Sequence, residues 1–169
     1  MSVKKNLYKA IKELILSKTD IRHVALYNSQ FDNMDQEDTF LFPCAFVEFS
    51  QLNYVTKQEG LQESEVVVKI HVGLESIEKE ELYVFDLLED IHTELQGFEV
   101  KGLFTALNRL SETQDINHDN VIVWSIDYES LLSDDSAHRS KKMSAIQLTD
   151  VNIITDTTTE STKPFLRHL

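Results

Sequence analysis

The chain has 169 residues, 41% of them hydrophobic and 9% aromatic, which fits one folded domain with a sizeable core and room for an appendage. Only four Gly and two Pro exclude a collagen-like or low-complexity chain. The formal net charge of −13 disfavours nucleic acid as a directly bound ligand, because phosphate binding depends on Lys and Arg. This charge indicates either simple solubility or a surface that nucleic acid passes without being held.

Segments typical of export or membrane insertion are not found. Cys44 is the single cysteine, so it cannot form an intrachain disulfide, and a buried, small hydrophobic role is expected for it. Lys12 and Glu13 interrupt the apolar residues near the N-terminus, which therefore lacks the apolar region of a signal peptide. No run approaches the roughly 18 apolar residues of a membrane span. We expect a soluble protein made in the cytoplasm.

Residues 3–17 predict an amphipathic helix with a narrow apolar stripe. The stripe consists of Val3, Leu7, Ile11, Leu14 and Ile15, and the other side carries Lys4, Lys5, Lys9 and Lys12. Packing against a core is favoured over binding to a membrane surface, because aromatic anchors are few. A short strand is expected over 21–27. The acidic segment 29–39 is interpreted as a solvated loop, since its spacing lacks the ligand positions of a calcium loop.

Residues 40–50 predict a strand that is apolar on both faces until Glu48. Pro43 cannot donate a hydrogen bond to a neighbouring strand, so it should lie at the strand start or on an edge. Two-sided apolarity requires a cover on each face, and the second cover could be a helix of the same chain or a neighbouring subunit. A further strand over 52–58 and a turn over 57–61 complete an antiparallel meander with the next strand.

Residues 61–75 predict the central strand of the sheet. From Val66 the chain alternates strictly, which is typical of a strand with one buried face. One face carries Val66, Val68, Ile70, Val72 and Leu74, and the other carries Val67, Lys69, His71, Gly73 and Glu75.

A second helix is expected from an N-cap at Ser76 to a left-handed cap at Gly97. Its apolar stripe consists of Val84, Leu88, Ile91 and Leu95, widened by Phe85 and Leu87. Its outer face is acidic, with Asp86, Glu89, Asp90 and Glu94.

Residues 98–115 fit either a helical spacing or a strand, and the choice stays open at this point. A strand is expected over 121–128, with Ile122, Trp124, Ile126 and Tyr128 on one face. Composition becomes polar beyond Ser133, so we expect an α+β domain over 1–133 and a polar C-terminal extension or arm over 134–169 that orders against a partner. Within it, 145–154 could add a strand.

Motifs for nucleotide binding, hydrolysis or metal binding are not found, and we expect no catalytic, cofactor-binding or metal-binding residues. Glu48, Lys69 and His71 could meet across neighbouring strands, and a surface pair is the favoured interpretation of that meeting. The expected fold class is α+β: a twisted, mostly antiparallel sheet of about four to five strands with two main helices packed on one face.

The order of these elements resembles the tail terminator (tail-completion, head–tail joining) proteins of tailed bacteriophages. The resemblance covers about residues 3–130 and includes an N-terminal helix, an apolar strand with Pro (FPCAFVEF) and a long alternating strand (ESEVVVKIHVGLE). A helix follows at once (SIEKEELYVFDLLEDIHTELQG), and a strand ending in an aromatic residue (VIVWSIDYES) closes the domain. The loop 29–39 and the tail after 133 depart from the family pattern.

The resemblance implies a non-catalytic virion protein that forms a ring, commonly a hexamer, at the head–tail junction or tail end. Its partners would be copies of itself and phage connector and tail proteins; DNA would pass through without specific binding, and assembly would take place in the host cytoplasm. We predict a subunit interface formed by Phe40, Phe42, Phe46, Phe49, Tyr54, Lys69 and His71. The alternative is an intracellular acidic adaptor that recognises a protein partner. An enzyme with an unrecognised site is the third hypothesis.

Overall fold

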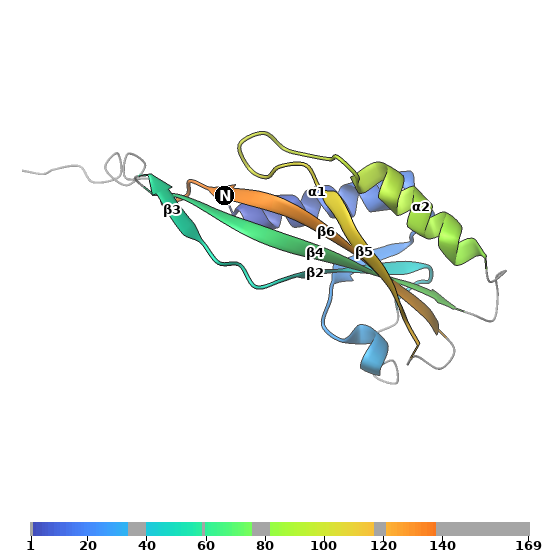
Figure 1. Ribbon diagram of the computed structural model, residues 1–169. Helices are drawn as coiled ribbons and strands as arrows, with labels where there is room; N and C mark the ends of the chain where they lie inside the picture. Colours follow the sequence, from blue (N-terminus) through green and yellow to red (C-terminus); the bar gives the residue numbers. More distant parts are fainter. Residues whose placement is uncertain (1, 34–39, 59, 76–81, 117–120, 138–169) are drawn as a thin grey trace, which may run out of the picture.

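A computed structural model describes residues 2–33, 40–58, 60–75, 82–116 and 121–137. Two α-helices, one short 3-10 helix and six strands follow one another along these residues (Figure 1). In chain order they are α1 (Val3–Lys18), β1 (His23–Leu26), η1 (Gln30–Asn33), β2 (Cys44–Phe49), β3 (Val55–Gln58), β4 (Leu61–Glu75), α2 (Tyr83–Leu95), β5 (Asn108–Asp115) and β6 (Val121–Asp134).

The strands form one curved, mixed sheet with the order β1-β2-β4-β6-β5, and β3 pairs with β4. Only β1 and β2 run parallel; the other named pairings are antiparallel. The predicted α+β class is confirmed, with six strands in the sheet. The predicted central strand β4 has the expected bounds and lies between β2 and β6.

The predicted meander of 40–75 is wrong in its connectivity. β2 and β3 do not pair with each other; both pair with the same edge of β4, β2 with residues 68–73 and β3 with residues 61–63. The physical reason is length. β4 has 15 residues, whereas β2 and β3 have six and four, so the two short strands can follow one another along its edge.

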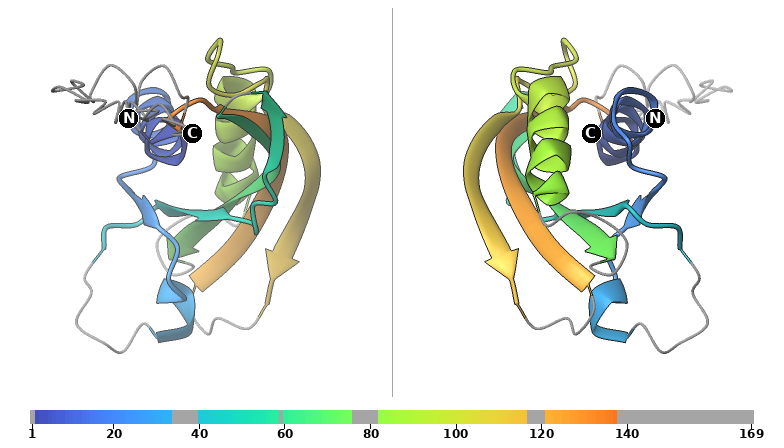
Figure 2. Two further views of the ribbon diagram at one scale, coloured as in Figure 1. Left: turned by 90° about the vertical axis from the view of Figure 1, so that its left-hand side faces the viewer. Right: turned by 90° about the vertical axis from the view of Figure 1, so that its right-hand side faces the viewer.

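Both helices lie on the concave side of the sheet, which we call the helix face (Figure 2). The predicted stripe of α1 is confirmed: Val3, Leu7, Ile11 and Ile15 are buried, and Leu14 is partly buried. The inward residues of β4, namely Val66, Val68, Ile70, Val72 and Leu74, are all buried against the helices and one another. Removal of this apolar surface from water, about 25 cal/mol per Å², is the main force that holds the two layers together.

In α2, the predicted buried residues Val84, Leu87, Leu88, Ile91 and Leu95 are confirmed. Phe85 is not part of the buried stripe, because its side chain is 49% exposed and contacts Trp124 edge-on at 5.6 Å between ring centroids. The predicted helix start at Ser76 lies outside the described residues. Gly97 has φ of +79°, the left-handed conformation expected just after the helix.

After α2, the open choice over 98–115 is decided in favour of a strand for its second part only: β5 spans Asn108–Asp115 and pairs with β6, whereas 98–107 forms neither a helix nor a named strand. Strand β6 is longer than predicted and continues to Asp134. The predicted C-terminal arm lies outside the described residues except for its first four positions, 134–137. Among the described residues, no helix is long and apolar enough to cross a membrane.

The opposite, convex side of the sheet is the open face, and one end of it carries a second small core. This outer cluster consists of Phe31, Cys44, Phe46, Val121 and Val123, with Phe40 and Phe42 partly buried at its margin. Phe31 comes from η1, which lies on the other side of β2 from α1 (Figure 2). The second cover of the 40–50 strand is therefore supplied within the same chain.

Part of the solvated-loop interpretation of 29–39 is wrong, because Phe31 is only 4% exposed. Its ring packs edge-on against Phe46 at 5.1 Å and against Phe40 at 6.1 Å between centroids. A Cβ atom added at Gly73 would overlap this ring, so the absence of a side chain at Gly73 makes the close approach of Phe31 possible. Residues 34–39 lie outside the described part of the chain.

Candidate interaction surface

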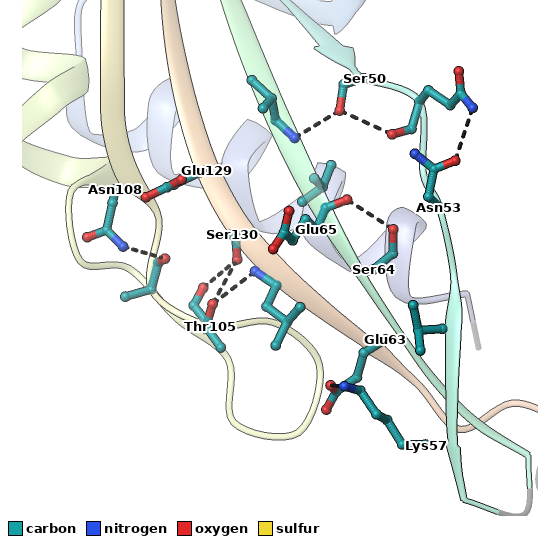
Figure 3. A pocket seen from close by; sticks show the side chains of 16 residues that line it. Ser50, Asn53, Lys57, Glu63, Ser64, Glu65, Thr105, Asn108, Glu129 and Ser130 are labelled. Carbon is teal, nitrogen blue, oxygen red and sulfur yellow. Dashed lines mark hydrogen bonds and ion pairs between the residues drawn. The ribbon is translucent and has the colours of Figure 1, made fainter.

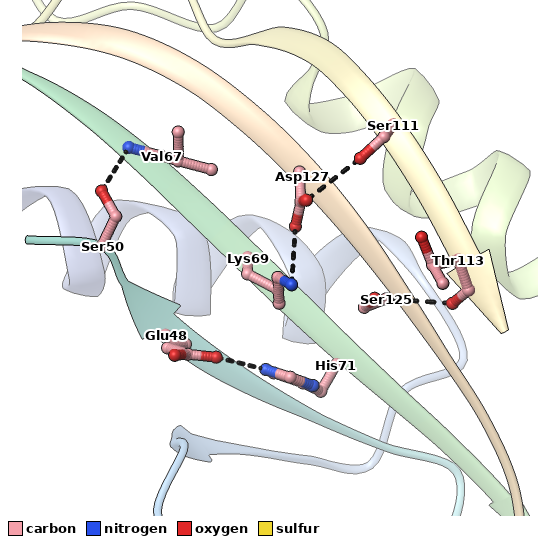
Figure 4. A network of polar contacts seen from close by, with 9 residues as sticks. All are labelled: Glu48, Ser50, Val67, Lys69, His71, Ser111, Thr113, Ser125 and Asp127. Carbon is pink, nitrogen blue, oxygen red and sulfur yellow. Dashed lines mark hydrogen bonds and ion pairs between the residues drawn. The ribbon is translucent and has the colours of Figure 1, made fainter. Parts of the chain in front are cut away.

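Polar side chains form a continuous row across the open face, next to the outer cluster. Glu48 on β2 lies opposite Lys69 on β4, Lys69 lies opposite Asp127 on β6, and Asp127 lies opposite Ser111 on β5. His71, Ser125 and Thr113 lie beside this row, and we call the seven residues the polar ladder (Figure 4). The ladder forms because outward positions of paired strands come into register every second residue.

At one end of the ladder, His71 contacts both Glu48 and Tyr27. Its Nε2 is 2.7 Å from Glu48 Oε2, and its ring stacks on the Tyr27 ring at 3.9 Å and 11°. Burial lowers the pKa of His71, and the hydrogen bond to Glu48 only partly opposes that effect. The imidazole is therefore neutral at pH 7, and Nε2–H donates to the carboxylate.

In the middle of the ladder, Lys69 and Ser111 hold the Asp127 carboxylate. Lys69 Nζ lies 3.6 Å from Oδ1, and the Ser111 hydroxyl donates to Oδ2 at 3.0 Å. Oδ1 is buried and accepts no hydrogen bond from the described residues, so Lys69 is its charge partner. Ser125 donates to the Thr113 carbonyl at 3.4 Å. The polar groups of the ladder are thus largely satisfied by one another.

A groove of about 730 Å³ lies on the open face where β2 ends and β3 begins (Figure 3). Its walls come from residues 50–57, from β4 and β6, and from the segment 105–108. Three glutamates line it: Glu63, Glu65 and Glu129. Of these three, only Glu63 forms an ion pair with a described residue, namely Lys57 at 3.5 Å. The groove is therefore open, polar and acidic.

Neither the ladder nor the groove forms a recognisable reaction centre. In the part of the chain that the structure describes, no group of three His, Cys, Asp or Glu side chains is placed to hold a metal ion. Burial raises the pKa of the Cys44 thiol to about 12, so it is protonated at neutral pH and is not a ready nucleophile. The prediction that Cys44 is a small buried hydrophobe is confirmed.

The seven residues of the predicted subunit interface lie in four places. Phe40, Phe42 and Phe46 belong to the outer cluster, in which Phe46 is only 1% exposed. Phe49 packs against the main core, and partly buried Tyr54 lies between β2 and β3, where burial raises its pKa. Lys69 and His71 are in the polar ladder. Their contact with a neighbouring subunit stays a prediction.

Sequence reasoning identified Glu48, Lys69 and His71 as residues that could meet, and the structure brings them together on one face. The sequence did not indicate the contacts of Tyr27 and Phe31, because these residues lie in or next to segments without a long alternating pattern. Asp127 was placed on the correct face of its strand, but its pairing with Lys69 depends on the register between β4 and β6. No periodicity within one strand encodes that register.

No protein-family model matches the chain, and no curated protein matches its sequence. A chain from the virion of a native gene transfer agent particle is similar in structure, with a TM-score of 0.46 and 8% sequence identity. The alignment covers 79% of this chain and 92% of that chain.

Proposed function

We propose that this chain is a structural, non-catalytic virion protein that forms a ring at the head–tail junction or tail end of a phage. The ring joins tail to head, contacts connector and tail proteins, and lets DNA pass through its central hole. Assembly takes place in the host cytoplasm before the protein becomes part of the virion.

The order of elements supports this proposal. An amphipathic helix, an apolar strand that begins next to Pro43, a long alternating strand, a helix and a closing strand are all present in the order that the tail terminator resemblance requires.

The open face is the observation that carries the proposal. Its basic groups are paired within the chain, Lys69 with Asp127 and Lys57 with Glu63, whereas Glu65 and Glu129 have no ion-pair partner among the described residues. Among the described residues, the two lysines of this face already have carboxylate partners, and its unpaired carboxylates repel phosphate. In a ring, a face of this kind suits a lumen through which DNA slides.

Light scattering and negative-stain images of the purified protein test the ring directly. We expect a ring-shaped particle with a central hole. A protein that stays monomeric at high concentration, both alone and with tail proteins, would overturn the proposal.

The lumen assignment has a separate test in Glu129→Lys. This substitution repeats a new cation in every subunit around the hole, so we expect salt-sensitive retention of duplex DNA, measured by gel shift. Glu99→Lys is the matched control, because Glu99 is also exposed but lies outside the groove. Equal DNA retention by both variants would argue against a lumen on the open face.

An acidic adaptor is the second candidate, favoured by the exposed carboxylates of Asp86, Glu89 and Asp90 on α2. A monomer that binds a basic protein, with affinity that falls steeply with salt, would favour this function over the ring.

A further inference from the structure

We propose that two copies of the chain dock through their helices, with α1 of one copy lying antiparallel against α2 of the next. The contact joins a basic stripe on α1 to an acidic stripe on α2. This inference deepens the proposed function and rests on its premise that the protein self-assembles.

The basic stripe consists of Lys5, Lys9, Lys12 and Leu16, which recur at i, i+4, i+7 and i+11. It lies on the side of α1 away from the buried stripe, and the aliphatic Leu16 at its end is 40% exposed. Among the described residues, no lysine of α1 takes part in an ion pair; Lys12 lies 6.0 Å from the centroid of the Tyr8 ring. The first turn of α1 contains Lys4 and Lys5 and no acidic residue, which opposes the helix dipole.

The acidic stripe consists of Asp86, Glu89 and Asp90 on the outer side of α2, away from its buried residues, and Phe85 and Glu94 lie at its two opposite margins. Asp86, Glu89 and Asp90 are exposed, Glu94 is partly exposed, and none of the four accepts a hydrogen bond or forms an ion pair with the described residues. Glu94 lies in the last turn, where the helix dipole disfavours a negative charge. Each helix therefore carries charge at one end that its own dipole disfavours.

An antiparallel arrangement matches the two stripes at the end that contains Leu16 and Phe85. Leu16 lies four residues from Lys12, and Phe85 lies four residues from Glu89, about 6 Å in each helix at 1.5 Å per residue. With Leu16 against the exposed Phe85 ring, Lys12 comes next to Glu89. Lys9 and Lys5 then lie level with the last turn of α2, where Glu94 carries a negative charge on the far margin of the stripe. The same arrangement places the α1 N-terminus beside the α2 C-terminus, so the disfavoured charges compensate each other.

A second copy is the occupant that the charges favour. Within one chain α1 and α2 contact each other through their sides and lie on the same face of the sheet, and no described ion pair joins the two stripes (Figure 2). Both halves of the complementary pair are thus present on each molecule and remain exposed. The basic stripe could also attract nucleic acid, but the net charge of −13 on the chain opposes such binding.

Two charge-reversed variants test the contact by light scattering. The first is Lys9→Glu with Lys12→Glu, and the second is Glu89→Lys with Asp90→Lys. We expect each variant alone to be monomeric, because its two stripes then carry like charge. We expect an equimolar mixture to regain the assembly of the native protein, since each stripe then meets its opposite on the other variant.

Arg22→Glu with Lys101→Glu is the matched control. It changes the formal charge by the same amount as the reversal on α1, at exposed positions outside both stripes, and we expect normal assembly. Circular dichroism checks that every variant is folded.

The outcomes separate this contact from the proposed function. If the native protein assembles and both reversed variants assemble equally well, the helix contact is wrong while self-assembly stands. Failure of the mixture to assemble also overturns the contact. If the native protein is monomeric under all conditions, the proposed ring is wrong and the contact fails with it.

Discussion

At one end of the open face, the Phe31 ring covers Gly73 and packs against Phe40 and Phe46, whereas a few residues along β4 the polar side chains of the ladder pair with one another. Both regions are built on the same two central strands, β4 and β6. The apolar end removes surface from water and should contribute strongly to stability. The polar end exchanges hydrogen bonds with water for hydrogen bonds within the sheet, which contributes little net free energy. Substitutions in the two regions should therefore differ in cost.

The largest effect is expected for Phe31→Ala. The side chain is 4% exposed, and its removal leaves a cavity over Gly73 and beside Phe46. We expect a loss of about 3 kcal/mol in the free energy of unfolding, measured by urea denaturation.

Lys69→Ala is the matched control for Phe31→Ala in the polar ladder. Its ion pair with Asp127 is partly exposed, but the variant leaves the buried Asp127 Oδ1 without its charge partner, so we expect a loss of about 1 kcal/mol, well below that of Phe31→Ala. Equal losses in the two variants would remove the contrast between the two ends of the face.

An intermediate effect is expected for Gly73→Ala. The new methyl group would overlap the Phe31 ring and lie 3.1 Å from Cys44 Sγ, so the outer cluster must shift. We expect a loss of about 1–3 kcal/mol by overpacking, again from urea denaturation.

The double variant Gly73→Ala with Phe31→Ala shows whether that loss arises from the ring. Once the ring is absent, the added methyl group should be tolerated, so the two losses should not add. Strict additivity would show that Gly73 is required for another reason.

The smallest effect concerns the pH dependence of stability through His71. Burial lowers its pKa in the folded protein from the ordinary value of 6.5, so the unfolded chain binds the proton more readily. The stability that neutral His71 contributes above about pH 6.5 is therefore lost as the pH falls through the folded value. We expect the stability of the native protein relative to His71→Gln to decrease from pH 7.5 to pH 5.5, by less than about 1 kcal/mol.

Urea denaturation of both proteins at the two pH values makes this comparison. An increase at pH 5.5 would mean that a charged pair between His71 and Glu48 dominates over burial, in which case the polar end would resemble a buried ion pair.

Much of the fold could be predicted from local patterns. The apolar residues of α1 recur with the helical period, and β4 alternates with the period of two, so both elements and their buried faces follow from residues close in sequence. The acidic and basic stripes of the two helices are visible in the same way. The segment 98–115 could not be assigned, because β5 is exposed along its whole length and therefore has no buried face to generate a period.

The sequence by itself determined the helix and strand periods, the single-sided burial of β4, and the charge carried by each helix. Only the tertiary structure decided that β2 and β3 share one edge of β4, that Phe31 covers Gly73, and that Glu48, Lys69, Asp127 and Ser111 form one row. The physical reason is that periodicity depends on residues a few positions apart. Strand register and the covering of a face depend on contacts between residues that are distant in the chain. Which of these contacts form is decided jointly by strand length, by the turns and by the total apolar surface that is buried.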